Sequence, residues 1–483
     1  MAEPVSEDVL VLDILQNHLD VDSDVYDLDK ACIELEKLSS RGNADAQYLY
    51  SLFLYSGTSV TEDRTSALEL MKRSSGSGNQ KASRTLDEIS KGGDWTASFI
   101  ELKLKGEQKN VDACAELFEV YGKGGKHIRK DHSESLRWYT MNAEKGDAEA
   151  QNVIGYMYLM GKGNIPKDHK KAKHWLHLSA DSGNSEAMYR LATAYMTGMK
   201  GFKQNIKQAL KWYKASADAG HADARHDLAE FYMTDRRPDF DKAAELLAMS
   251  AKQGQTDSMH KLGLLYAYGQ GVSRDPDKAI EYLKSACELN NSECMLDYAN
   301  MRYEGQILEQ DLGEAAKWFQ RAADLNNSAA EYCLACMYGN GSYFEKDDKK
   351  AAELFRNAAE AGEPNSQYIF GCFCYEGRGI PKDDDEAAIW FGIAAEQGHP
   401  AAKAFYGMMA VTGTGADIDA DTGLRMIKEV ADAGYSDGQY YLGRLYMDGN
   451  HVKKSISMAK KYLKKSAKQG DADASALLNL LNS

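Results

Sequence analysis

A motif of about 36 residues recurs along most of the chain, and this period constrains the fold more than any other feature. Its first position, which we number 0, holds a small residue in every copy: Ala46, Ala82, Ala113, Ala150, Ala187, Ala224, Ser258, Cys294, Ala330, Ser366, Ala402 and Gly438. The intervals are 36 or 37 residues, except for 31 after Ala82 and 34 after Ala224. A fixed period of this length predicts an array of stacked supersecondary units.

Residues 147–183 show the pattern of one repeat most clearly. One helical face within this range carries Ala150, Ile154, Gly155 and Tyr158. These residues predict an amphipathic first helix, which we call helix A. Gly161 and Gly163 follow it and permit a tight turn. Asp168 then stands where the N-cap of a second helix, helix B, is expected. The repeat is therefore a helix pair.

Helix B carries a large ring at a recurring position. The position is occupied by Trp138, Trp175, Trp212, Trp318 and Trp390, with Tyr282 in another repeat. Small residues at positions 0 and +5 of helix A would let the two helices pack closely. We interpret the rings as core residues, because a large apolar ring at a fixed place is typical of packing.

At these positions the chain resembles the Sel1-like repeat family. The resemblance rests on alanine first, glycine at +5, tyrosine at +8, a Gly-x-Gly turn, an Asp-x-x-Lys-Ala entry to helix B, and Trp or Tyr within it. It is seen again in Gly263, Tyr266, Gly269, Gly271, Asp275, Lys278, Ala279 and Tyr282. The resemblance implies an all-α fold, a right-handed α/α superhelical solenoid of about twelve helix-turn-helix repeats. The tetratricopeptide repeat has a similar shape but a period of 34 residues.

Three repeats depart from the pattern. The repeat from Ala82 lacks the Gly-x-Gly turn, and its helix B is predicted from Trp95 to Lys105, so we expect a local irregularity there. The repeat from Ala224 replaces its turn with Asp235-Arg236-Arg237-Pro238-Asp239, so we expect a shorter and stiffer loop there. The repeat from Ala402 has Ala410 where tyrosine is usual and has Thr422-Gly423 at the entry to helix B.

The ends of the chain differ from the array in charge. We divide the chain into an acidic N-terminal helical cap at 1–42, the repeat solenoid at 43–470 and a C-terminal capping helix at 471–483. Residues 1–36 hold eleven acidic residues and one lysine, whereas residues 451–470 hold seven lysines and no acidic residue. Such runs are consistent with two solvated ends. They are also consistent with a polar rod whose ends attract partners or a second copy.

Composition excludes several classes of function. The formal net charge of −15 argues against nucleic-acid binding, which needs a cationic surface. No segment approaches the ~18 apolar residues of a membrane span. The acidic start does not resemble a secretory signal, so we expect a cytoplasmic protein. We interpret the eight cysteines as small buried apolar residues. No pattern predicts a catalytic residue, a cofactor or a metal site.

Positions +2 and +9 of helix A lie opposite its buried arc and are the candidate partner-binding positions. They supply Tyr48, Tyr189, His226, His260, Tyr303, Tyr332, Tyr368, Tyr375 and Tyr440. Tyrosine gives amphipathic contact of the kind that protein interfaces favour. The alternative is that these rings only pack between neighbouring A helices.

These features favour a non-enzymatic scaffold or adaptor that binds protein or peptide clients through a concave helix-A surface. The family resemblance implies roles in assembling complexes, in quality control or in bacterial signalling. One alternative is a rod that assembles through its charged ends. A second is a hydrolase of the cysteine-rich Sel1-like type. That group carries regular cysteine pairs between helices A and B, whereas helix B here holds only Cys32 and Cys287.

Overall fold

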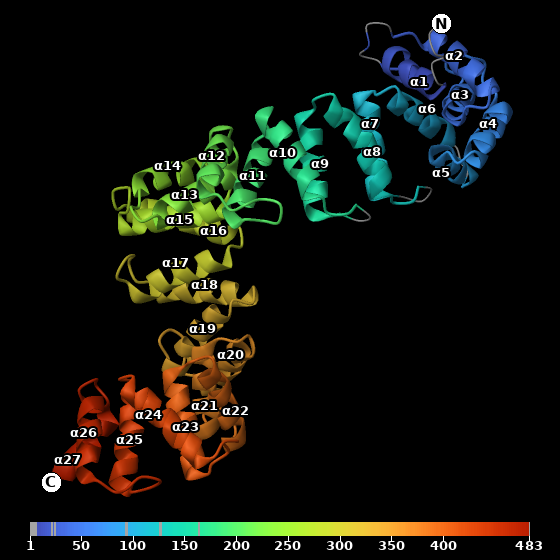
Figure 1. Ribbon diagram of the computed structural model, residues 1–483. Helices are drawn as coiled ribbons and strands as arrows, with labels where there is room; N and C mark the ends of the chain where they lie inside the picture. Colours follow the sequence, from blue (N-terminus) through green and yellow to red (C-terminus); the bar gives the residue numbers. More distant parts are fainter. Residues whose placement is uncertain are drawn as a thin grey trace. The chain divides into compact units, whose positions relative to one another are not determined.

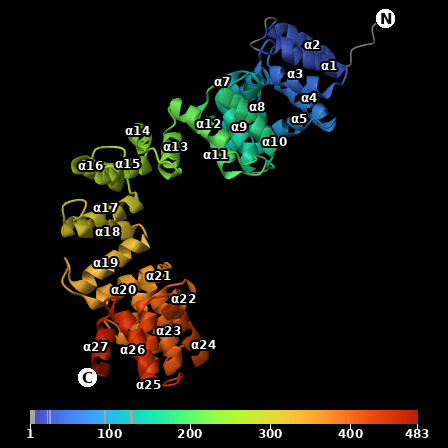
Figure 2. The ribbon, with the colours of Figure 1, turned by 60° about the vertical axis from the view of Figure 1, so that its left-hand side comes forward.

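The computed structural model describes residues 7–20, 23, 26–91, 95–124, 128–162 and 165–482, and Gly163 lies outside these ranges. All regular secondary structure in the described ranges is helical. The chain divides into two compact units, Met1–Phe231 and Tyr232–Ser483. Within each unit, consecutive helices form a tandem of hairpins, as Figure 1 and the rotated view in Figure 2 show. The predicted all-α array is confirmed.

The helices of the first unit are α1 (Glu7–Asp13), the π-helix η1 (Ile14–His18), α2 (Leu28–Ser40), α3 (Ala44–Ser56), α4 (Arg64–Gly76), α5 (Gln80–Ser90), α6 (Trp95–Glu107), α7 (Val111–Lys123), α8 (His132–Glu144), α9 (Ala148–Met160), α10 (His169–Asp181), α11 (Ser185–Thr197) and α12 (Ile206–Asp218). Helix α13 (Ala222–Thr234) contains the boundary between the units.

The helices of the second unit are α14 (Phe240–Ala251), α15 (Thr256–Tyr268), α16 (Pro276–Glu288), α17 (Ser292–Glu304), α18 (Leu312–Asp324), α19 (Ser328–Asn340), α20 (Asp348–Glu360), α21 (Pro364–Glu376), α22 (Asp384–Glu396), α23 (Pro400–Thr412), α24 (Ala420–Asp432), α25 (Ser436–Asp448), α26 (Ile456–Ala467) and α27 (Ala472–Asn482). The odd-numbered helices from α3 to α25 are the twelve predicted A helices, and each is followed by its B helix.

Local sequence signals explain where the helices begin and end. Asn43 caps α3 by accepting a hydrogen bond from the backbone nitrogen of Ala46 at 2.9 Å. Asp168 caps α10, as predicted, and accepts from the backbone nitrogens of Lys170 and Lys171. Gly161 ends α9 in the left-handed conformation with φ of 67°, which glycine adopts without a steric penalty. The repeat therefore forms from its own caps.

Glycine at position +5 allows the two helices of a repeat to approach closely. A Cβ atom on Gly155 of α9 would lie 2.7 Å from Cγ of Leu176 on α10, and one on Gly371 would lie 2.8 Å from Cε1 of Phe391. The residue that contacts the glycine, Leu176 or Phe391, thus comes directly after the recurring ring in the sequence. Trp138, Trp212 and Trp318 are buried, whereas Trp175, Trp390 and Tyr282 are half-buried. Trp175 and Trp390 still pack against buried clusters, so these recurring rings belong to the core but in some repeats keep part of their surface exposed.

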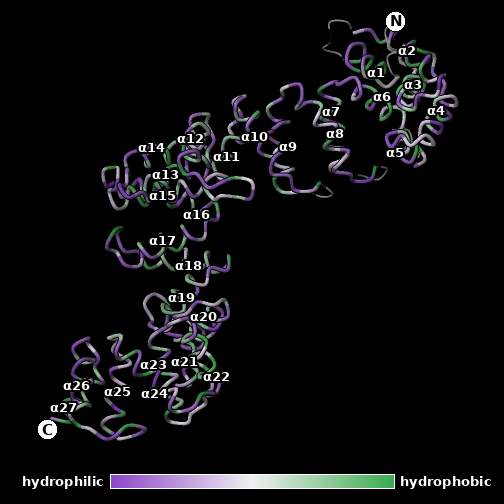
Figure 3. The backbone as a smooth tube through the Cα atoms, viewed as in Figure 1, coloured by the Kyte–Doolittle hydropathy of each residue, from purple (hydrophilic) through white to green (hydrophobic). Residues whose placement is uncertain are grey.

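The cores of the two units combine many buried alanines and leucines with large rings such as Phe53, Trp138 and Phe391. In the second unit one cluster of buried residues extends from Ala267 on α15 to Met409 on α23. Figure 3 shows hydrophobic and hydrophilic residues interleaved along the helices, as amphipathic helices require. No helix in the described part of the chain combines the length and apolarity needed to cross a bilayer.

The repeat formed by α5 and α6 is irregular, as its 31-residue interval predicts. Its position +5 is Asp87 instead of glycine. Helix α6 packs against α3 of the preceding repeat and against α7. The close-contact glycine lies on α6 instead, because a Cβ on Gly106 would be 2.6 Å from Leu117 and from Trp138. This rearrangement places polar side chains between α5 and α6.

Candidate functional site

All nine predicted partner-binding residues lie on A helices, but their exposure differs. Tyr48 and His260 are buried, with 1% and 5% of their surface exposed. The other seven are half-buried: Tyr189, His226, Tyr303, Tyr332, Tyr368, Tyr375 and Tyr440. A half-buried ring has a fixed orientation and still presents one edge or face, so these seven are the positions that could contact a partner.

Tyr48 has no exposed face because of the irregular repeat. Its ring belongs to the same buried cluster as Ile100 and Leu104 of α6, and α6 packs over α3. Burial raises the pKa of the Tyr48 hydroxyl far above its usual value. Tyr48 therefore presents no ring face to a partner.

In the first unit, Tyr189 links neighbouring A helices. Its hydroxyl donates a hydrogen bond to Oδ2 of Asp227 at 3.1 Å. Its ring stacks on His221, with 4.7 Å between the centroids and 17° between the planes. Burial raises the pKa of Asp227 above its usual range. These contacts are the ones that the packing interpretation of position +2 predicts.

Similar side-chain bridges occur between adjacent repeats of the second unit. His260 Nε2 on α15 lies 2.9 Å from Oδ2 of Asp297 on α17. The hydroxyl of Tyr303 on α17 lies 3.4 Å from the hydroxyl of Ser342, in the connection that follows α19. These contacts stabilise the spacing of adjacent repeats.

Three predicted residues, Tyr368, Tyr375 and Tyr440, meet in one place. They belong to an aromatic cluster on α21, α22, α23 and α25 that consists of Tyr368, Tyr375, Phe391, Phe405, Tyr440 and Tyr441. The ring of Phe405 lies 5.1 Å from Tyr375, 4.6 Å from Phe391 and 5.8 Å from Tyr441, between centroids. Tyr441 contacts Tyr440 at 5.2 Å, and Tyr368 contacts Phe391 at 5.8 Å. The cluster joins three successive A helices.

Polar groups border this aromatic cluster. His399 stacks on Tyr368 with 4.8 Å between ring centroids, and burial lowers the pKa of its imidazole. Asp437, in the first turn of α25, has a pKa that burial raises above its usual range. Burial also raises the pKa of Tyr368 and of Tyr441. The half-buried Asp437 carboxylate and the faces of these tyrosine rings both attract positive charge. This part of the surface therefore favours contact with a cationic side chain.

Sequence reasoning missed Phe405 and Tyr441, which hold the cluster together. Both are at position +3 of their repeats, counted from Ala402 and Gly438. An aromatic residue at the same position in two consecutive repeats was a usable signal. Only the pairing of neighbouring repeats in the structure shows that the two rings meet.

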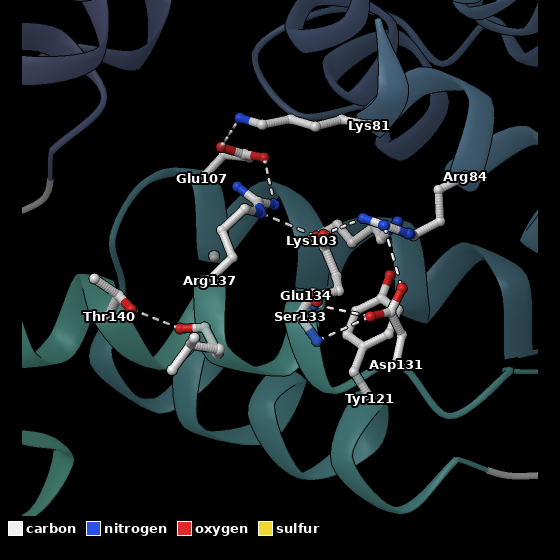
Figure 4. Close-up of polar contacts among 12 residues, drawn as sticks. Lys81, Arg84, Lys103, Glu107, Tyr121, Asp131, Ser133, Glu134, Arg137 and Thr140 are labelled. Carbon is white, nitrogen blue, oxygen red and sulfur yellow. Dashed lines mark hydrogen bonds and ion pairs between the residues drawn. The ribbon is translucent and has the colours of Figure 1, made fainter. Parts of the chain in front are cut away.

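A buried ionic network in the irregular repeat was also missed (Figure 4). Lys103 of α6 is 2% exposed, and its Nζ donates to Glu88 Oε2 at 2.6 Å and to Thr85 Oγ1 at 2.8 Å. The hydroxyl of Tyr121 on α7 donates to the other carboxylate oxygen of Glu88 at 2.7 Å. Burial lowers the pKa of Lys103. Each buried polar group here has a partner, as its desolvation requires.

The network continues through α8. Glu107 accepts from Arg137 Nη2 at 3.1 Å and from Lys81 Nζ at 3.3 Å. Glu134 accepts from Arg137 Nε at 2.9 Å and also binds Arg84. Two sequence signals indicated that α5 and α6 would be separated. Position +5 is Asp87 instead of glycine, and the interval after Ala82 is only 31 residues. The identity of the bridging side chains depends on α6 packing against α3, which the sequence does not show.

Comparison with known proteins agrees with this geometry. The sequence model of the Sel1 repeat matches residues 44–79, 111–147, 148–184, 185–221, 222–255, 256–291, 292–327, 328–363, 364–399 and 436–471. The chain belongs to the Sel1 repeat family. The two stretches left unmatched between these Sel1 repeats are 80–110 and 400–435. They contain two of the three repeats that depart from the pattern in sequence, whereas the third, from Ala224, lies within the matched range 222–255.

Two solved structures show the same fold. A protective antigen of uropathogenic Escherichia coli strains that displays an SLR fold is 24% identical, with a TM-score of 0.60 over 94% of this chain and 97% of that chain. A Sel1 repeat protein from Oxalobacter formigenes is 25% identical, with a TM-score of 0.54 over 68% of this chain and 93% of that one. No curated protein matches the chain significantly. Among the residues that the structure describes, no group of His, Cys, Asp or Glu side chains is placed to hold a metal ion.

Proposed function

We propose that this Sel1 repeat protein is a non-enzymatic scaffold that binds a protein partner across the A helices of its second unit. The observation that supports it is the aromatic cluster, in which Tyr375, Phe405 and Tyr441 contact one another in series on α21, α23 and α25. A surface that joins three repeats suits an extended segment lying across them, which is how solenoids use their length.

The chemistry of the aromatic cluster indicates what such a segment would carry. Half-buried tyrosine rings give large contact area at a low cost in side-chain entropy. Asp437 and the ring faces together favour a lysine or arginine side chain, through charge and cation–π attraction. The partner segment is therefore proposed to combine apolar residues with at least one basic residue. This preference fits a chain whose formal net charge is −15.

The test compares two double variants in a quantitative affinity purification. Tyr375→Ala/Tyr440→Ala removes two half-buried rings of the cluster. Tyr268→Ala/Tyr343→Ala removes two tyrosines that are 52% and 54% exposed and lie outside the cluster. Both variants should keep the helicity of the parent. Recovery of the partner should fall at least tenfold for the cluster variant and stay unchanged for the control. Equal recovery by both variants would show that the partner binds elsewhere.

A further inference from the structure

A pocket of about 500 Å³ lies beside the buried ionic network of the first unit. Arg84 and Glu88 of α5, Lys91 directly after it and Tyr121 of α7 line the pocket. Residues 129–131 of the connection before α8 and His132 at the start of α8 also line it. The volume falls in the range of about 300–1,000 Å³ that is usual for small-ligand sites. The pocket shares no residue with the aromatic cluster, and part of its lining comes from α5 of the irregular repeat.

The acidic side chains of this pocket are already neutralised by cations. Asp87 pairs with Lys91 at 2.7 Å, and Asp131 pairs with Arg84 at 3.2 Å. Glu88, which also lines the pocket, pairs with buried Lys103 at 2.6 Å. Each carboxylate that lines the pocket thus has one positive partner inside the protein. This pairing reduces the repulsion that the three carboxylates would exert on a bound anion.

Two cations of the pocket remain without a counter-charge. Arg129 and Lys130 are exposed and line the pocket, and neither has an ion-pair partner within the part of the chain that the structure describes. With buried Lys103 as the partner of Glu88, the three carboxylates of the lining are all paired and these two cations remain unpaired, although the chain as a whole is acidic. Arg84 adds a guanidinium that is held in place by both Asp131 and Glu134.

We infer that this pocket binds a phosphate monoester. Such a group carries a charge of about −1.5 to −2 at pH 7, which matches the two unpaired cations. The planar fork of an arginine fits two phosphate oxygens at once. A single carboxylate would leave one of the two cations unmatched. The phosphate is carried either by a small metabolite or by a phosphorylated side chain of a protein, since both present the same group.

Isothermal titration with two probes tests the assignment at fixed ionic strength. The probes are glycerol 2-phosphate and a short phosphoserine peptide, with the unphosphorylated peptide as reference. Arg129→Gln/Lys130→Gln removes the unpaired cations, and their exposure means that the fold should not change. Arg236→Gln/Arg237→Gln makes the same charge change on the exposed connection between α13 and α14, and serves as the control.

The parent and the control variant should bind at least one phosphorylated probe with the same affinity. The pocket variant should bind it at least tenfold more weakly. The probe that binds more tightly identifies the source of the phosphate. Equal affinity in both double variants would overturn the inference. So would a hexaglutamate peptide that binds through Arg129 and Lys130 as tightly as either phosphorylated probe, because the pocket would then recognise carboxylates.

Discussion

Glu107 shows at the scale of a single residue how the irregular repeat depends on charge. The carboxylate is 2% exposed and is held by Lys81 and Arg137. Replacement by glutamine keeps the shape and removes the charge. Glu107→Gln should lower the local stability of α6–α8 by about 3 kcal/mol at pH 7. This value is at the lower end of the cost of breaking a buried ion pair, because Arg137 keeps its second partner, Glu134. Hydrogen exchange of peptides from α7 and α8 measures this change.

The stability that Glu107 supplies should depend on pH with a definite sign. Burial raises the pKa of Glu107, but Arg137 and Lys81 lower it more, so the pKa in the folded protein is below the usual 4.5. The folded state therefore binds fewer protons than the unfolded state as pH falls below about 4.5, and stability decreases through this range. The difference between parent and Glu107→Gln should shrink as pH falls through the folded pKa. An undiminished difference at pH 3 would contradict this account.

At the scale of the helix pair, the contact of α23 with α24 depends on two facing glycines. A Cβ on Gly407 would lie 2.7 Å from the backbone oxygen of Gly423, and a Cβ on Gly423 would lie 2.5 Å from the oxygen of Gly407. A backbone atom cannot move aside as a side chain can. Gly407→Ala should therefore destabilise the second unit by about 1–3 kcal/mol, although alanine is the better helix former. Urea denaturation followed by circular dichroism measures this effect.

Gly392→Ala on the adjacent helix α22 is a matched control for that substitution. Its Cβ would meet only the ring of Tyr406, at 3.4 Å or more, which is ordinary contact. Without a clash, the gain in helix propensity remains, and the variant should be equal to the parent or more stable by up to about 1 kcal/mol. If both alanine variants destabilised equally, close backbone contact would not be the reason for glycine at 407.

The helices themselves could be predicted from the sequence because their signals are local. Asp168 and Gly161 act on their own helix ends, and the spacing of apolar residues identifies the buried face. Contacts between repeats could not be predicted in the same way. Tyr48 and Tyr368 both occupy position +2, yet Tyr48 is buried beneath α6 whereas Tyr368 is half-buried. The aromatic cluster and the phosphate pocket both depend on such contacts between helices distant in sequence.

At the scale of the whole molecule, a solenoid is stabilised mainly by contacts between neighbours. Helix α27 packs on α26 and closes the C-terminal end of the second unit, where the hydroxyl of Ser466 donates to Asp471 at 2.7 Å. A chain that stops at Gly470 loses this helix and leaves one face of α26 uncovered.

Hydrogen exchange should then show a graded response to the truncation. Amides of α25 and α26 should exchange at least tenfold faster, because the last repeat loses its only neighbour on that side. Amides of α3–α12 should exchange at the rates of the parent, since several repeats separate them from the new end. Faster exchange throughout the chain would contradict the nearest-neighbour description and would show that the array unfolds as one cooperative block.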